Sequence, residues 1–101
     1  MAANIFIRPP NPQRRVVVTG MAALTPLGLN LNDSWQSALA GRSGIGPITL
    51  FDASAMDTKI AGEVKGFDPN PYIDKKEQKK MDRFIQFAMA AAKQALLDAQ
   101  L

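Results

Sequence analysis

Two stretches of the chain carry apolar side chains in patterns typical of β-strands. Residues 15–19, RVVVT, form a short β-branched run that ends at Gly20. A run that is apolar on both faces favours a strand buried on both sides of a parallel sheet. In residues 59–67, side chains of different character alternate along the chain, which predicts a second strand. One face of this strand would carry Ile60, Gly62 and Val64, and the other Ala61 and Glu63.

Residues 33–40, DSWQSALA, have the polar start and the apolar stripe of a helix. Asn30 or Asn32 is a suitable N-cap, and Gly41 is the residue type that commonly ends helices. Residues 41–47, GRSGIGP, hold too many glycines and a proline to continue any regular element. The apolar side of the helix, which we expect in the core, consists of Trp35, Ala38 and Leu39.

The last segment predicts a long core helix. Asp74 and Glu77 have the spacing of a capping box, so a helix should begin there, and Asp82 is a second possible start. At 100° per residue, the apolar side chains share an arc roughly 140–160° wide. This face comprises Met81, Phe84, Ile85, Ala88, Ala91, Ala92, Ala95 and Leu96, with Gln86, Lys93, Gln94 and Asp98 opposite. Its alanines allow close packing inside a layered protein larger than this chain.

Strands separated by helices indicate an α/β fold. The 101 residues, 47% hydrophobic and 21% charged, have the composition of one soluble globular domain at most. No apolar run approaches 18 residues, so we predict no membrane partner. Residues 1–13 hold one charge and three prolines. We expect them to be a disordered N-terminal extension rather than a targeting peptide, and the protein to be cytoplasmic.

The chain has no Cys and no His, which excludes most familiar active sites. It therefore lacks a thiolate nucleophile, an imidazole base to activate its serines and a soft-metal ligand set. Asp52 is better placed to start a turn over Ala53 and Ser54 than to form an acid–base pair. Gly20 and Gly28 do not have the spacing of a phosphate-binding loop. We predict no catalytic residue, no metal and no cofactor.

Basic residues concentrate in KKEQKK, at the start of the last segment. On a helix, Lys76, Lys79 and Lys80 lie within about 100° of one another, and we call these three residues the lysine trio. The simplest interpretation of the lysine trio is a solvent-exposed helix face without a partner. Its position is unfavourable for the helix itself, because cations near a helix N-terminus oppose the helix dipole. The net charge is only +3, and Tyr72 and Phe84 form no interleaved stacking pattern. We therefore expect no nucleic-acid partner.

Five segments together resemble the N-terminal part of a β-ketoacyl-acyl carrier protein synthase of the elongating type II kind. This is the condensing enzyme of fatty acid synthesis. The resemblance covers residues 14–101, and polyketide ketosynthases and their chain-length-factor partners share it. The segments, in order, are RRVVVTGMAALTPLG, SWQSALAGRSGI, FDAS, IAGEVKGFDP and KKEQKKMDRFIQFAMAAAKQALLDAQL.

The resemblance implies a thiolase-like α/β fold and a homodimer. In that fold, helices pack on mixed sheets in two similar halves, and residues 14–101 would form an incomplete part of the first half. The chemistry implied is a decarboxylative Claisen condensation with malonyl-acyl carrier protein. It uses one Cys and two His, and these lie beyond the matched segment in the family. The resemblance therefore implies a truncated domain that is inactive alone.

The resemblance also implies a role for the lysine trio. In these synthases a basic patch just ahead of the long helix docks the acidic acyl carrier protein, and its cations match Lys76, Lys79 and Lys80. Two alternatives remain open, a non-catalytic chain-length-factor-like partner and a carrier-docking fragment of a polyketide system. The residue at the family's Cys position would separate them from the synthase.

Overall fold

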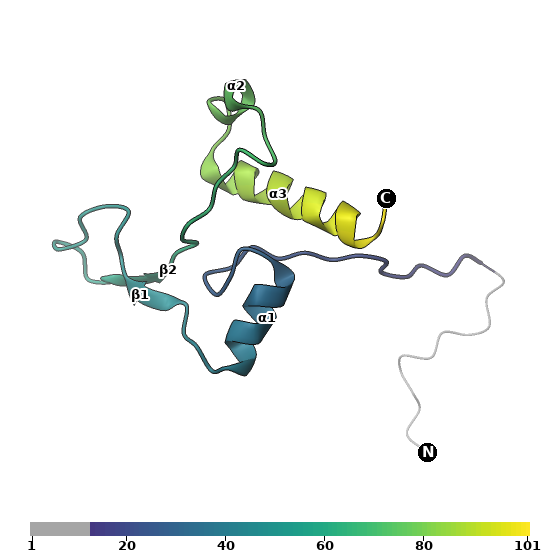
Figure 1. Ribbon diagram of the computed structural model, residues 1–101. Coiled ribbons are helices and arrows are strands. Elements are labelled where there is room, and N and C mark those ends of the chain that lie inside the picture. Colours follow the sequence, from purple (N-terminus) through teal and green to yellow (C-terminus); the bar gives the residue numbers. More distant parts are fainter. Residues whose placement is uncertain (1–12) are drawn as a thin grey trace, which may run out of the picture.

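The computed structural model describes residues 13–101, and the N-terminal extension predicted for residues 1–13 lies outside them except for Gln13. The elements follow in the order α1 (Leu31–Leu39), β1 (Ile45–Pro47), β2 (Ile60–Gly62), α2 (Lys75–Gln78) and α3 (Arg83–Asp98). Figure 1 shows α1 and α3 on opposite sides of the loop that precedes α1, with the two strands extending to one side.

Helix α1 is held at both ends by the residues that the sequence indicates. Asn30 is the N-cap, and its side chain accepts a hydrogen bond of 2.8 Å from the Asp33 N–H. Gly41, just past the helix, has a φ of +70°, a left-handed conformation that glycine adopts without steric cost. The predicted cap and the stop at Gly41 are confirmed, with Asn30 rather than Asn32 as the cap. The helix begins at Leu31, two residues before the predicted start, because Asn30 is the residue that caps it.

The two strands form a small antiparallel sheet. Ile45 pairs with Gly62, Gly46 with Ala61, and Pro47 with Ile60. The prediction that residues 41–47 continue no regular element is therefore wrong for β1. A pairing partner 15 residues away overrides the local signal, and Pro47 is tolerated because each strand of a two-stranded sheet is an edge strand. The predicted second strand is confirmed only for Ile60–Gly62.

The predicted strand at residues 15–19 is not formed. This segment is extended but pairs with no strand in the described part of the chain, and Val16, Val17 and Val18 are 94%, 69% and 76% exposed. A buried central strand needs a neighbour on each side, and the two strands described here pair with each other. The expected burial is wrong for this chain, and the mixed sheet implied by the resemblance is absent from residues 13–101.

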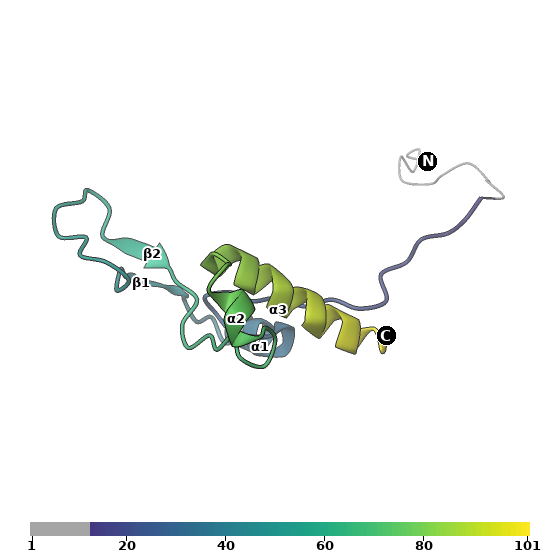
Figure 2. The ribbon, with the colours of Figure 1, turned by 90° about the horizontal axis from the view of Figure 1, so that it is seen from above.

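Helices α1 and α3 contact the loop between them through their polar sides. Three consecutive loop carbonyls, those of Leu27, Gly28 and Leu29, accept hydrogen bonds from the side chains of Ser37, Ser34 and Gln94 at 3.0, 3.2 and 3.0 Å. Gln94 also donates to the Tyr72 hydroxyl at 3.0 Å. The loop is thus fixed from both sides. In the view of Figure 2, α1 lies behind α2 and α3.

The apolar sides of both helices face outward, opposite to the expectation. Trp35 and Leu39 on α1 are 59% and 62% exposed, and Phe84 on α3 is 69% exposed. Among the described residues only Ala53, Ile73 and Ala90 are buried apolar side chains. Periodicity identified the apolar faces correctly, but no layer within residues 13–101 covers them.

Gly20 lies against the last turn of α3. A Cβ built on it would sit 2.6 Å from the Ala95 carbonyl oxygen and 2.6 Å from the Ala99 nitrogen. The next residue, Met21, donates its N–H to the Asp98 carboxylate at 2.9 Å. The glycine after the β-branched run therefore permits close approach of two backbones.

We expect Gly20→Ala to lower the free energy of unfolding by about 1–3 kcal/mol in the protein that carries this segment, because backbone atoms must move to admit the methyl group. Denaturant unfolding measures the change. Gly46→Ala is the matched control, since a Cβ there meets nothing within 4 Å. Equal stability of the two variants would contradict the packing argument.

Candidate functional site

The lysine trio spans the end of one helix and the turn that follows it. Lys76 lies in α2, Lys79 is its C-cap with φ −67° and ψ −18°, and Lys80 lies in the turn before α3. The sequence predicted helix starts after Asp74 and Asp82, and both are confirmed. The trio is therefore carried by a short helix and a turn, not by one continuous helix.

The expected capping box is not formed. The Asp74 side chain makes no cap hydrogen bond, and neither does that of Asp82. The Glu77 carboxylate is instead engaged with Lys80, whose Nζ lies 3.6 Å from Glu77 Oε1. The turn is closed by backbone bonds from the Lys80 N–H to the Glu77 carbonyl at 3.0 Å and from the Met81 N–H to the Gln78 carbonyl at 3.2 Å.

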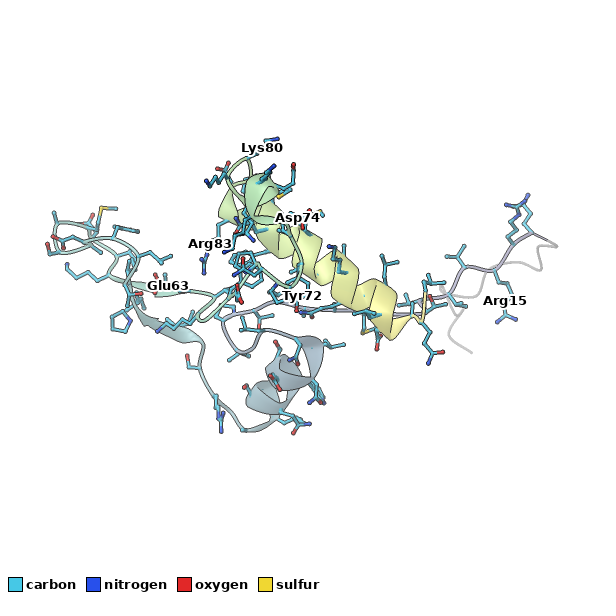
Figure 3. The ribbon with its side chains drawn as sticks, turned by 45° about the horizontal axis from the view of Figure 1, so that its top comes forward. Arg15, Glu63, Tyr72, Asp74, Lys80 and Arg83 are labelled. Atoms are coloured by element: carbon cyan, nitrogen blue, oxygen red, sulfur yellow. The ribbon has the colours of Figure 1, made fainter. Side chains whose placement is uncertain are left out.

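All three lysines of the trio are exposed, and so is Lys75. Because the backbone from Lys76 to Lys79 stays helical, these two side chains lie on one face, three residues apart. Figure 3 shows Lys80 at the outer end of this region, away from α3. Within residues 13–101, Lys76 and Lys79 have no ion pair, so their ammonium groups are open to a partner.

Two neighbouring cations are committed to contacts within the chain. Arg83 donates to the Val64 carbonyl at 2.8 Å, and its guanidinium carbon lies 5.0 Å from the centre of the Phe87 ring. Lys93 donates to the Tyr72 carbonyl. The role of Arg83 was not predicted from the sequence, although its spacing of four residues from Phe87 is that of a detectable helical pair.

The polypeptide that precedes α2 is fixed by its own contacts. Gln78 donates to the Ile73 carbonyl at 2.7 Å and to the Asn70 side chain at 3.0 Å. Ile73 is buried, and the ring of Phe67 packs edge-on against Phe87 with centroids 5.0 Å apart. These contacts tie α2 to the loop before it and that loop to α3, so the lysine trio is presented from an anchored segment.

The cavity beside the loop that precedes α1 presents one carboxylate, and that carboxylate is already engaged. An open cavity of about 630 Å³ lies between the loop before α1 and α3, and it is lined in part by Met21, Leu29, Tyr72, Gln94 and Asp98. Asp98 is the one carboxylate in that lining, and it already accepts the Met21 N–H. No group of three or more His, Cys, Asp or Glu among residues 13–101 could hold a metal ion.

Two carboxylates have shifted acidities, and both stabilise the segment between β1 and β2. The Ser54 backbone N–H donates to Asp52 at 3.0 Å and lowers the pKa of that carboxyl, which confirms the predicted turn. Glu63 accepts hydrogen bonds from the hydroxyl and N–H of Thr49 and from the N–H of Leu50. The Thr49 side-chain bond is the main cause that lowers the pKa of Glu63 below 4.5.

The depressed pKa of Glu63 predicts an acid-sensitive attachment of this segment. A carboxyl whose folded-state pKa is lowered stabilises the fold above its ordinary pKa and loses that contribution as the pH falls through the lowered value. In the protein that carries this segment, we expect hydrogen exchange of the peptide at residues 48–59, corrected for intrinsic rates, to accelerate as the pH falls below 4.5. Glu63→Gln should exchange fast already at pH 7, whereas Asp57→Asn should behave as the unsubstituted chain.

Comparison with known proteins places this arrangement in a family. The fold resembles that of a solved structure described as the ishigamide ketosynthase/chain length factor, with a TM-score of 0.79 and 39% identity over 87% of this chain and 22% of that chain. The thiolase-like α/β class is thereby confirmed. A profile described as beta-ketoacyl synthase, N-terminal domain, matches residues 13–101, and the chain belongs to this family.

Curated relatives agree with this assignment. The chain is 54% identical over 89 residues to 3-oxoacyl-[acyl-carrier-protein] synthase 2 of Synechocystis sp., covering 88% of this chain and 21% of that protein. It is 52% identical to the protein of the same name from Coxiella burnetii, over 88% of this chain and 22% of the relative. The chain thus spans about a fifth of the length of these relatives.

Proposed function

We propose that this chain is the N-terminal part of a 3-oxoacyl-[acyl-carrier-protein] synthase, which elongates acyl chains by decarboxylative condensation with malonyl-acyl carrier protein. The observation that carries the proposal is the 54% identity over nearly all of residues 13–101 to a curated synthase. Residues 14–101 form part of the synthase domain, and residues 1–13 form an extension ahead of it. The nucleophile and the groups that stabilise negative charge come from outside this chain, since it has no Cys and no His.

Within this function the lysine trio docks the acyl carrier protein. Carrier proteins of this class are acidic, and Lys76, Lys79 and Lys80 offer exposed ammonium groups on an anchored turn. Such charges act mainly on encounter and orientation.

The complete protein is a cytoplasmic homodimer. None of the helices in the described part has the length and apolar character needed to cross a bilayer.

A chimera tests whether residues 13–101 can serve as the N-terminal part of a condensing enzyme. Residues 13–101 replace the matching 89-residue segment of the Synechocystis relative, whose own sequence supplies the remainder. We expect this chimera to condense acyl and malonyl carrier thioesters with a kcat/KM within about tenfold of the relative, because the fold and more than half of the residues are shared. A folded chimera that cannot be acylated would contradict the proposal.

A second candidate is a chain-length-factor-like subunit without condensing activity. It is favoured by the likeness to the ketosynthase/chain length factor structure, although the 39% identity there is lower than that to the synthases. The two candidates differ at one residue outside this chain. If the natural continuation of this sequence has a Cys at the family's nucleophile position, followed by two separated His, the protein is the synthase. Another residue at the Cys position would favour the factor.

A further inference from the structure

Resting on the docking function proposed above, we propose that Glu77 is a built-in counter-ion that limits the affinity of the lysine trio for its acidic partner. The residue stands between Lys76 and Lys79 in sequence, and its carboxylate faces Lys80. It therefore occupies the position that a carboxylate of the partner would take. The three lysines therefore differ in the described structure, because Lys80 is paired with Glu77 while Lys76 and Lys79 have no ion pair.

The geometry makes this competition direct. The Glu77 and Lys80 side chains remain 52% and 72% exposed while they are paired, so a partner can reach both. A carboxylate that binds Lys80 must displace Glu77 or approach close to it, and like charges at that distance repel. The same negative charge stays beside Lys76 and Lys79 after the partner has docked. Glu77 thus opposes association and favours release.

Glu77 is not needed to hold the turn. Backbone bonds of 3.0 and 3.2 Å close the turn without any side chain, and Gln78 anchors α2 through Ile73 and Asn70. Because both members of the ion pair are exposed to water, its own contribution to stability is small. Replacing Glu77 by Gln therefore removes the charge while leaving the backbone that presents the lysines in place.

The test measures binding of the chimera to purified holo acyl carrier protein at low salt. We expect Glu77→Gln to tighten the dissociation constant roughly two- to fivefold, the range for one exposed charge pair. The gain should fall toward zero at high salt, where exposed charges are screened. Asp57→Asn is the matched control, because it removes the same charge from an exposed residue between β1 and β2 and should leave binding unchanged.

The Lys80→Gln background separates the ion pair from the general charge effect. In that background Glu77→Gln should give a smaller gain, because Lys80 is no longer there to be released. An unchanged or weaker affinity of Glu77→Gln, or a gain matched by Asp57→Asn, overturns the role of Glu77. If reversal of all three lysines leaves binding unchanged in the same assay, the docking function itself fails and this inference falls with it.

Discussion

In the chimera, reversing Lys76, Lys79 and Lys80 to Glu should lower kcat/KM for carrier-bound substrate by roughly threefold to a hundredfold. Each exposed ion pair contributes about 0.2–1 kcal/mol, so three together give about 0.6–3 kcal/mol. The loss should shrink as salt rises, because exposed charges are screened beyond about 8–10 Å at ordinary salt and at shorter distances as the salt concentration increases. Kinetics with acyl and malonyl carrier thioesters at two ionic strengths provide the measurement.

Two controls make the result specific. Turnover of a small thioester that needs no carrier should barely change, because the lysine trio lies on the surface. Reversing Arg42, Lys59 and Lys65 to Glu changes the net charge equally on other exposed parts of the chain and should cost much less. Equal losses on carrier and small substrates would indicate damage to the fold, and no loss on either would leave the trio as a solvated face.

The second large effect concerns residues 13–101 expressed alone. We expect this segment to lack a cooperative unfolding transition, to bind a hydrophobic dye and to give poorly dispersed amide resonances. The reason is the apolar surface it leaves in water, which includes Val16–Val18, Trp35 and Phe84. Large exposed apolar surfaces in soluble proteins mark contacts with other chains or a tendency to aggregate. Co-expression with the remaining four fifths of the Synechocystis relative should restore a compact, folded complex. A sharp, dispersed spectrum of the isolated monomer would refute this.

Local signals in the sequence predicted local structure well. Asn30, Gly41 and Asp52 each act within three or four residues of chain, and the cap, the helix end and the turn all appear where expected. The helix starts after Asp74 and Asp82 were likewise predicted from the sequence, although neither side chain makes a cap hydrogen bond. These features depend on the dihedral angles and hydrogen bonds of neighbouring residues, which a single sequence contains.

Features that depend on distant parts of the chain were not predictable in the same way. The pairing of residues 45–47 with 60–62 is decided by a partner strand, and the burial of residues 15–19 by strands that residues 13–101 do not form. Gln94 illustrates the remaining difficulty. It lies opposite the apolar face of α3, where a polar side chain is expected to be solvated, yet it bonds the Leu29 carbonyl 65 positions away.

For the candidate site, the sequence and the structure contribute different things. The resemblance singled out Lys76, Lys79 and Lys80, and their docking role stays a prediction. The structure adds that Lys80 is paired with Glu77 and that Arg83 is committed to Val64 and Phe87. The Glu77–Lys80 and Arg83–Phe87 pairs have the spacing of neighbours on a helix, which can be detected in the sequence. Which partner a long cationic side chain contacts depends, however, on the local backbone.

The loop before α1 also sets an order in which the chain can assemble. Ser34 and Ser37 bond loop carbonyls only six and ten residues away, so α1 and the loop can associate as soon as both have left the ribosome. The Gln94 bond closes a far longer stretch of chain, and the entropy of closing a loop grows with its length. We therefore expect α1 and the loop to form an early folding unit. Helix α3 should pack against this unit later and stabilise it through Gln94. Substitutions at Ser34 should slow folding, whereas substitutions at Gln94 should mainly speed unfolding.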